Sequence, residues 1–156
     1  KTDYLSVVGN ETLPSDYEGL FCYVLDIDQN KLDIIENVSS ILNKKALIAT
    51  TDSNQCCFLR VTQWIKAISE SQMVITDSFH GAVFCIIFNK PFWVVANQER
   101  GLDRLTSLLG EFGLEDRIIS QVYDIKQSQL INWEKVNATK RALRKKSIEF
   151  LLESLS

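Results

Sequence analysis

The amino-acid sequence predicts an α/β domain of three layers, in which helices cover both faces of a mainly parallel sheet. Short apolar runs alternate with segments of helical periodicity along most of the chain, which is the pattern of repeated strand–helix units. The runs are apolar at nearly every position, as is typical of strands buried on both faces. A length of 156 residues suits one compact domain. We expect it to span residues 20–156, with residues 1–19 as a linker or the remnant of an upstream domain.

Five apolar runs are expected to form the strands, because they are short and rich in β-branched and aromatic residues. Pro91 opens the fourth run, where its missing N–H does the least harm to a sheet. The runs are Leu20–Ile27, Ala46–Thr51, Met73–Asp77, Pro91–Asn97 and, as a short fifth strand, Arg117–Ser120.

Between and after these runs, apolar residues recur at intervals of three and four, which predicts helices. The helix after the third strand is apolar all round and is expected to be buried on most sides. Gly113 is expected to cap the helix that follows the fourth strand. The last helix is long and amphipathic, with the basic stretch "KRALRKK" in its middle. The expected helices are residues 30–44, 61–71, 80–90, 102–113 and 132–155.

Composition narrows the class of protein. The net charge of -3 disfavours nucleic-acid binding by bulk electrostatics. No apolar run reaches the roughly 18 to 20 residues that span a bilayer, and no secretory signal is visible, so we expect a cytoplasmic protein. The cysteines lack C-x-x-C spacing, which predicts no metal site. Cys22 and Cys85 lie in apolar runs and are expected to be core residues in a reducing compartment.

The only histidine, His80, lies in the stretch "TDSFHG" between the third strand and the next helix. Right-handed crossovers bring the carboxyl ends of all strands to one edge of the sheet, where ligands bind. The first N–H groups of a helix lack internal partners and attract anions. Ser78 would be a helix cap or a ligand hydroxyl, and Gly81 would let a ligand approach the backbone. Other polar residues expected at this edge are Thr51, Asp52, Asp77, Asn97 and Arg100.

The turn by itself leaves two interpretations open. His80 is either an anion ligand or base, or a hydrogen-bonded structural histidine beside ordinary helix caps. No glycine-rich dinucleotide fingerprint follows the first strand and no Walker loop is present, so NAD binding is disfavoured.

The stretch "MVITDSFHGAVFCIIFNKPFWVV" resembles the core signature of the polysaccharide pyruvyl transferase family. Members carry a Thr/Ser-Asp-Ser/Arg-Phe/Leu-His-Gly turn, an apolar helix and a strand that starts with x-Lys-Pro-Phe. The resemblance covers roughly Phe21–Ser120, the C-terminal half of a typical member. Arg104 stands where members carry an arginine ahead of "LL".

The resemblance implies a Rossmann-like domain similar to the C-terminal half of a GT-B glycosyltransferase. It implies a bacterial enzyme that transfers the enolpyruvyl unit of phosphoenolpyruvate onto two sugar hydroxyls, forming a pyruvate ketal on an exopolysaccharide, a capsule or a lipid-linked precursor. This chain would be the donor-binding half, with the N-terminal domain of the same protein as its missing partner and "KTDYLS" as a cut or processed end. The isolated fragment would be inactive. No cofactor beyond the donor substrate is implied.

The resemblance and the turn together assign expected roles. His80 is the expected general acid/base or phosphate ligand. Ser78 and Gly81 are expected contacts to the anion, and Arg100 and Arg104 are the expected clamp for the charge on the leaving phosphate.

Other polar residues are expected to be structural. Asp77 should orient the turn, because its carboxylate would repel an anionic donor, and Arg117 should form a local ion pair. The "KRALRKK" stretch is a solvated helix face or, alternatively, a contact with the anionic inner face of the membrane. Two other functions stay open. One is half of a GT-B glycosyltransferase or sugar-nucleotide epimerase, which would bind a nucleotide sugar, and the other is a non-catalytic α/β binding module.

Overall fold

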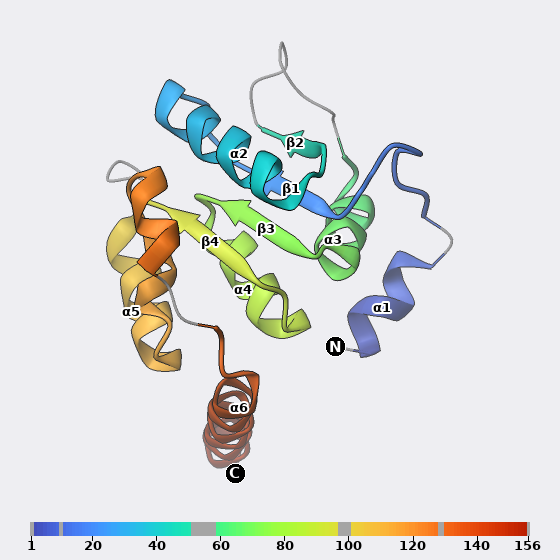
Figure 1. Cartoon of the computed structure of the whole chain (residues 1–156). Helices are drawn as coiled ribbons and strands as arrows, with labels where there is room; N and C mark the ends of the chain where they lie inside the picture. The colour runs from blue at the N-terminus through green and yellow to red at the C-terminus, as the bar shows by residue number, and fades with distance from the viewer. Residues whose placement is uncertain (1, 10, 51–58, 97–100, 128–129, 156) are drawn as a thin grey trace.

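A five-stranded parallel sheet forms the centre of the computed structural model (Figure 1). The structure describes residues 2–9, 11–50, 59–96, 101–127 and 130–155. The strand order is β2-β1-β3-β4-β5, and every neighbouring pair is parallel. The predicted α/β class with a parallel sheet is therefore confirmed. The strands are β1 (Leu20–Tyr23), β2 (Ala46–Ala49), β3 (Met73–Thr76), β4 (Phe92–Val95) and β5 (Ile118–Ile119).

Helices cover both faces of this sheet, so the fold has the three layers of a Rossmann-like domain. The core of one face packs against α3, α4 and α5, whereas the core of the other face packs against α2 and η3. The α-helices are α1 (Thr2–Val8), α2 (Gln29–Leu42), α3 (Val61–Glu70), α4 (Phe79–Phe88), α5 (Leu102–Phe112) and α6 (Trp133–Ser154). Two short 3-10 helices are η2 (Glu115–Arg117) and η3 (Val122–Gln127).

The strands are shorter than the apolar runs that predicted them. The run after Tyr23 leaves the ladder, and Asp77 is not part of β3. At this point side chains replace ladder bonds, because Leu25 donates its N–H to the Asp77 carboxylate at 2.7 Å. A run of apolar residues indicates that the segment is buried, and the buried segment extends beyond the last paired residue of each strand.

Helix ends follow local sequence signals. Ser78 caps α4, and Asp28 caps α2 by accepting the Lys31 N–H at 2.8 Å. Gly113 ends α5 at a φ of 64°, in the left-handed region that favours glycine, so its predicted role is confirmed. Asn89 takes the same conformation at the end of α4.

The segment before β1 packs on the domain. It contains a helix, α1, where the sequence analysis expected a linker or the remnant of an upstream domain. Val8 is buried, and the Tyr4 ring meets the Phe84 ring edge-on with centroids 5.0 Å apart. Tyr17 donates its hydroxyl to the Ala67 carbonyl of α3 at 2.9 Å. The segment is thus a packed part of the structure, while the domain boundary at residue 20 stays a prediction.

The two described cysteines, Cys22 and Cys85, are buried and free, as predicted. Burial raises the pKa of both thiols, which keeps them protonated. Within the described ranges, no three His, Cys, Asp or Glu side chains are grouped to hold a metal ion. A search of the same ranges finds no helix with the length and apolar character to cross a membrane.

Candidate functional site

The order of the strands creates a place for a ligand between β1 and β3. From β1 the chain passes to β2 on one side, and from β2 it returns to β3 on the other side of β1. The helices that follow β1 and β3, α2 and α4, therefore cover opposite faces of the sheet. Loops that diverge in this way leave a crevice at the carboxyl ends of the strands, where α/β proteins bind ligands.

A cavity of about 420 Å³ opens at this edge. Its volume lies in the range of small-molecule sites. Three of the five predicted site residues, Ser78, His80 and Arg104, meet around it. The residues that line it are Leu25, Asp77, Ser78, Phe79, His80, Gly101 and Arg104.

His80 lies in the first turn of α4 with an exposed side chain. Its ring meets the Phe79 ring edge-on, with centroids 5.8 Å apart. No hydrogen bond or ion pair of this imidazole occurs among the residues that the structure describes. The imidazole of His80 is therefore exposed on the cavity wall, and its role as an anion ligand or a base stays a prediction.

Arg104 reaches the same cavity from the first turn of α5. Its Cζ atom lies 5.7 Å from the centroid of the Phe79 ring, so Phe79 contacts both the imidazole and the guanidinium. Gly101 precedes α5 with a φ of 77°, and a Cβ atom there would lie 3.1 Å from the Nε of Arg104. Glycine at position 101 therefore leaves room for the guanidinium beside the backbone.

Ser78 and Gly81 are used inside the turn. Ser78 is buried, and its Oγ accepts the Gly81 N–H at 3.5 Å, which is a helix-cap contact. A Cβ atom at position 81 would lie 2.4 Å from Oγ1 of Thr76. Gly81 does not line the cavity. The absence of a side chain at this position instead lets the helix pack closely against Thr76. Its role as an anion contact stays a prediction.

The predicted residues Arg100, Asn97, Thr51 and Asp52 lie outside the described residues. Arg100 therefore remains a sequence-based expectation.

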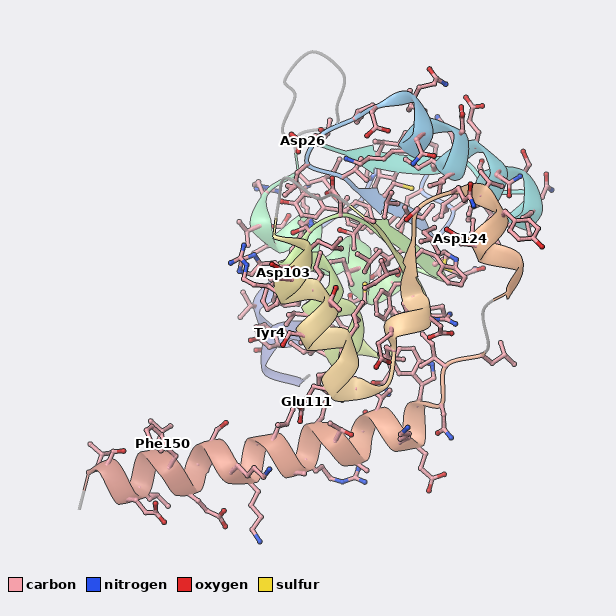
Figure 2. All side chains as sticks on the ribbon, turned by 90° about the vertical axis from the view of Figure 1, so that its left-hand side faces the viewer. Tyr4, Asp26, Asp103, Glu111, Asp124 and Phe150 are labelled. Atoms are coloured by element: carbon pink, nitrogen blue, oxygen red, sulfur yellow. The ribbon has the colours of Figure 1, made fainter. Side chains whose placement is uncertain are left out.

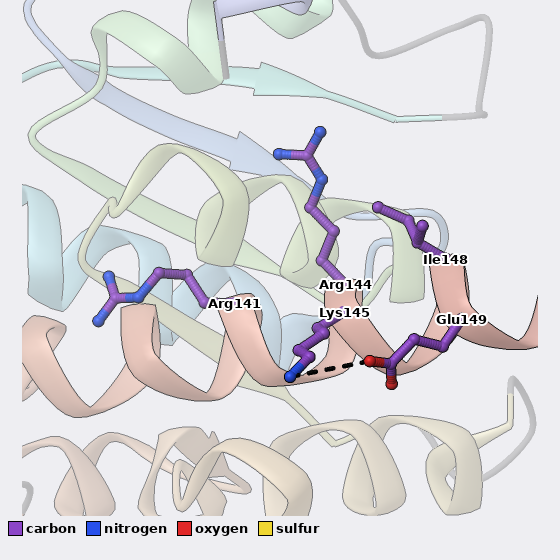
Figure 3. A pocket seen from close by; sticks show the side chains of 5 residues that line it. All are labelled: Arg141, Arg144, Lys145, Ile148 and Glu149. Atoms are coloured by element: carbon purple, nitrogen blue, oxygen red, sulfur yellow. Dashed lines mark ion pairs between the residues drawn. The ribbon is translucent and has the colours of Figure 1, made fainter.

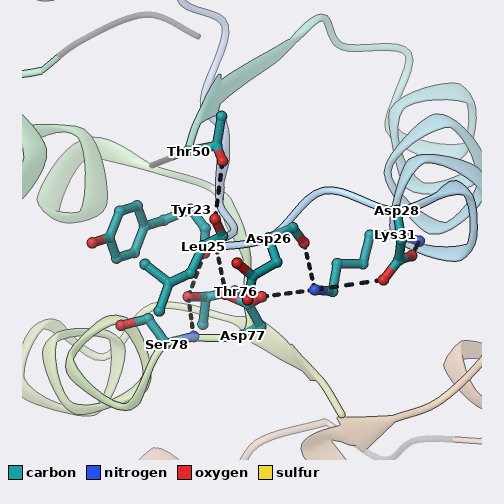
Figure 4. A network of polar contacts seen from close by, with 9 residues as sticks. All are labelled: Tyr23, Leu25, Asp26, Asp28, Lys31, Thr50, Thr76, Asp77 and Ser78. Atoms are coloured by element: carbon teal, nitrogen blue, oxygen red, sulfur yellow. Dashed lines mark hydrogen bonds and ion pairs between the residues drawn. The ribbon is translucent and has the colours of Figure 1, made fainter. Parts of the chain in front are cut away.

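A buried ion pair joins α2 to the turn after β3 (Figure 4). The Nζ of Lys31 lies 2.9 Å from Oδ2 of Asp77, and these side chains are 4% and 0% exposed. Oδ1 of Asp77 accepts the Leu25 N–H, and Lys31 also donates to the Asp26 carbonyl. The carboxylate is thus bonded to one donor from the loop after β1 and one from α2, which agrees with the orienting role expected of Asp77.

Thr76 strengthens the same junction. Its hydroxyl donates to the Tyr23 carbonyl at 2.6 Å and accepts the Ser78 N–H at 3.1 Å. Backbone groups at the ends of β1 and β3 are thereby linked through one side chain (Figure 4).

A comparison with protein families identifies the chain. A sequence model described as "Polysaccharide pyruvyl transferase" matches residues 1–99 of 156. The chain belongs to the polysaccharide pyruvyl transferase family. The match includes β1 to β4 and the whole "TDSFHG" turn, and it extends to the segment before β1. It ends before Arg104, whose assignment rests on the resemblance of its surroundings. No curated protein and no solved structure matches the chain.

Lys31 is the residue of this candidate site that the sequence analysis missed, although the sequence contains a signal for it. Lys31 occupies the first position of the buried stripe of α2, followed by Ile34, Ile35 and Val38. These positions have the i, i+3, i+4, i+7 spacing of a core-facing side. A lysine at such a position is rarely fully buried without a partner, so it indicates a buried carboxylate.

One arginine and one lysine outside the cavity, Arg117 and Lys140, have structural roles. Arg117 pairs with Asp116, as predicted, and its Cζ lies 4.3 Å from the centroid of the Trp93 ring. Lys140, in the "KRALRKK" stretch, donates to the Ile86 carbonyl and to Oδ1 of Asn89, both at 2.8 Å. This lysine therefore binds the carboxyl end of α4, where a cation is favoured.

Proposed function

We propose that this member of the polysaccharide pyruvyl transferase family binds phosphoenolpyruvate in the cavity at the carboxyl edge of its sheet. The carrying observation is that His80 of α4 and Arg104 of α5 line the same cavity. These side chains are a titratable group and a permanent cation, which suit a donor with a carboxylate and a phosphate.

Two features favour an anion in this cavity. The N–H groups of Phe79 and His80 belong to the first turn of α4, where an α-helix offers no internal acceptor. Arg104 adds a guanidinium that can donate two parallel hydrogen bonds to a phosphate or carboxylate. Asp77 does not oppose the anion strongly, because its carboxylate is buried and paired with Lys31.

The proposed reaction forms a ketal from the donor and two hydroxyls of a sugar. A proton is added at C3 of phosphoenolpyruvate, one hydroxyl oxygen bonds to C2 and loses its proton, and the C2–O bond to phosphate breaks. The second hydroxyl then bonds to C2 and loses its proton, so the products are the pyruvate ketal and inorganic phosphate. Arg104 and the first turn of α4 stabilise the charge that builds on the phosphate. His80 is suited to move a proton during these steps.

Membership of the family suggests the acceptor and the second domain that we propose as partners. We propose that this chain supplies the donor-binding, C-terminal half of a GT-B type enzyme, and that a sugar or lipid-linked oligosaccharide approaches from the N-terminal domain. The enzyme would act in the cytoplasm of a bacterium during exopolysaccharide or capsule synthesis. No cofactor besides the donor is required, and the isolated fragment would be inactive.

Isothermal titration of the full-length protein tests the proposal. Phosphoenolpyruvate is titrated beside several sugar nucleotides, with inorganic phosphate as a control for simple anion binding. We expect saturable binding of phosphoenolpyruvate and none of the sugar nucleotides. Binding of sugar nucleotides alone would instead support a glycosyltransferase or epimerase. Unchanged activity and anion binding in His80→Ala would support a non-catalytic module.

A further inference from the structure

The last part of α6 and its C-cap, residues 148–155, expose a row of large apolar side chains. Ile148, Leu151, Leu152 and Leu155 are 45%, 58%, 65% and 85% exposed. Their i, i+3, i+4, i+7 spacing places them on one side of the helix. We call these four residues the distal stripe. Figure 2 shows α6 running past the rest of the domain, with Phe150 near its free end.

The proximal half of α6 holds the helix in place. Val136 is buried, Leu143 packs against the core, and Lys140 is bonded to the carboxyl end of α4. The distal stripe follows the anchored part of the helix without a break, so the contacts of the proximal half also fix its position. Contact with the core explains the proximal half but not four exposed aliphatic residues at helical spacing.

Basic side chains precede the distal stripe on the same side of α6. Arg141, Arg144 and Lys145 lie seven, four and three positions before Ile148, so the same helical spacing joins them to it. Together with Ile148 and Glu149 they border a hollow of about 380 Å³ on the helix surface (Figure 3). Residues 140–155 contain five basic and two acidic residues, although the whole chain carries a net charge of -3.

This charge pattern argues against a second copy of the chain as the occupant. Two distal stripes in parallel would bring the three cations of each helix against those of its partner. In the antiparallel arrangement, the cations of one helix would lie against the leucines of the other. Lys145 already pairs with Glu149 of its own helix, with Nζ and Oε1 3.7 Å apart. Neither arrangement supplies a partner for Arg141 and Arg144, whose charge disfavours close contact with like charge.

We propose that residues 141–155 of α6 bind the surface of an anionic lipid bilayer. The distal stripe enters the boundary between headgroups and acyl chains, while Arg141, Arg144 and Lys145 contact the lipid phosphates. A bilayer of this kind offers negative charge and an apolar layer next to each other, which is the combination that this side of α6 presents. The helix lies on the membrane and does not cross it. This proposal stands on α6 alone and does not depend on the donor that the cavity binds.

Vesicle co-sedimentation of the full-length protein tests this inference. One set of vesicles contains phosphatidylglycerol mixed with phosphatidylcholine, and the other contains phosphatidylcholine alone. We expect the protein to sediment with the anionic vesicles only and to be released by high salt, since surface charges are screened.

Two variants separate the contributions. Replacing Arg141, Arg144 and Lys145 with glutamine should lower the affinity for anionic vesicles by roughly 100-fold. Leu151→Gln combined with Leu152→Gln should lower it by at least about tenfold, while keeping good helix formers in place. Val61→Gln is the matched control, because Val61 is 73% exposed on α3, and should bind as the natural protein does.

Three outcomes would overturn the proposal. The first is no sedimentation with anionic vesicles. The second is equal sedimentation with both kinds of vesicle. The third is a dimer, detected by light scattering, that the leucine double variant converts to a monomer while vesicle binding stays unchanged, which would assign the distal stripe to a second copy.

Discussion

The ionisable side chains on the two sides of the turn after β3 differ in their exposure to solvent. On the side facing α2, the Asp77 carboxylate is fully buried and is bonded to Lys31 and to the Leu25 N–H. On the side facing the cavity, His80 and Arg104 are exposed. Asp77 and His80 are only three positions apart in the chain, whereas Arg104 comes from α5.

This difference in exposure distinguishes residues that support the fold from residues that can bind a ligand. A charge removed from water must be paired and hydrogen-bonded, so the Asp77 side is committed to holding the β1 loop against the turn. A charge left in water beside a cavity is available to a ligand. We therefore expect substitutions on the buried side to change stability and substitutions on the open side to change donor affinity.

The largest effect is expected for Lys31→Ala. This substitution leaves the Asp77 carboxylate buried without its cation, and the free energy of unfolding should fall by about 3 to 5 kcal/mol. Urea denaturation followed by circular dichroism measures the change. Lys31→Met combined with Asp77→Asn should recover most of the loss, because no charge then remains buried. A loss below about 1 kcal/mol in Lys31→Ala would contradict the assigned support role.

Arg104→Ala tests the open side. The substitution should weaken phosphoenolpyruvate binding by roughly 10- to 100-fold, in line with the loss of hydrogen bonds to a charged group. Stability should change by no more than about 0.5 kcal/mol, because the side chain is exposed. Titration calorimetry and thermal melting measure the two quantities. Arg60→Ala is the matched control, since Arg60 is exposed at the start of α3 and pairs with Glu11. Equal affinity in both variants would remove Arg104 from the site.

Gly81→Ala tests the close packing of the first turn of α4 against Thr76. The new Cβ atom would lie 2.4 Å from Oγ1 of Thr76, which is already bonded to the Tyr23 carbonyl. We expect a loss of about 1 to 3 kcal/mol from overpacking, measured by urea denaturation. Gly110→Ala in α5 is the control, because its Cβ atom would meet only Oε1 of Glu115 at 3.6 Å. That control should gain about 0.5 to 1 kcal/mol from helix propensity. A neutral Gly81→Ala would show that the turn can relax.

The smallest effect concerns an exposed carboxylate near the end of β5. Asp124 accepts the Ser120 N–H at 2.7 Å and the Gln121 N–H at 3.0 Å, and these two bonds lower its pKa. The charged form is therefore favoured in the folded state. Its contribution to stability is present above the ordinary aspartate range and is lost as the pH falls below about 4.

Asp124→Asn should accordingly be slightly less stable than the natural protein at pH 7, with the difference shrinking in acid. Urea denaturation at neutral and acidic pH measures it. A difference as large as that of Lys31→Ala would break the distinction between exposed and buried carboxylates.

Sequence patterns predicted the strands of the sheet and the position of His80 at its edge. The apolar runs predicted all five strands, and the position of "TDSFHG" after the third run predicted that His80 would reach the ligand-binding edge. They failed where an apolar pattern was absent, since the segment of α1 was expected to be a linker or the remnant of an upstream domain. Its packing on α3 involves single residues such as Val8, which a periodicity analysis does not detect.

The sequence by itself determined the five strands, the helices between and after them, their order and the family, because these depend on residues that are close together in the chain. Only the tertiary structure decided which distant groups meet. Lys31 and Asp77 are 46 positions apart, and Lys140 and Ile86 are 54 positions apart. Such contacts depend on strand order and on how helices pack across the sheet. A local pattern can indicate that a lysine is buried, but the fold supplies the carboxylate that makes its burial stable.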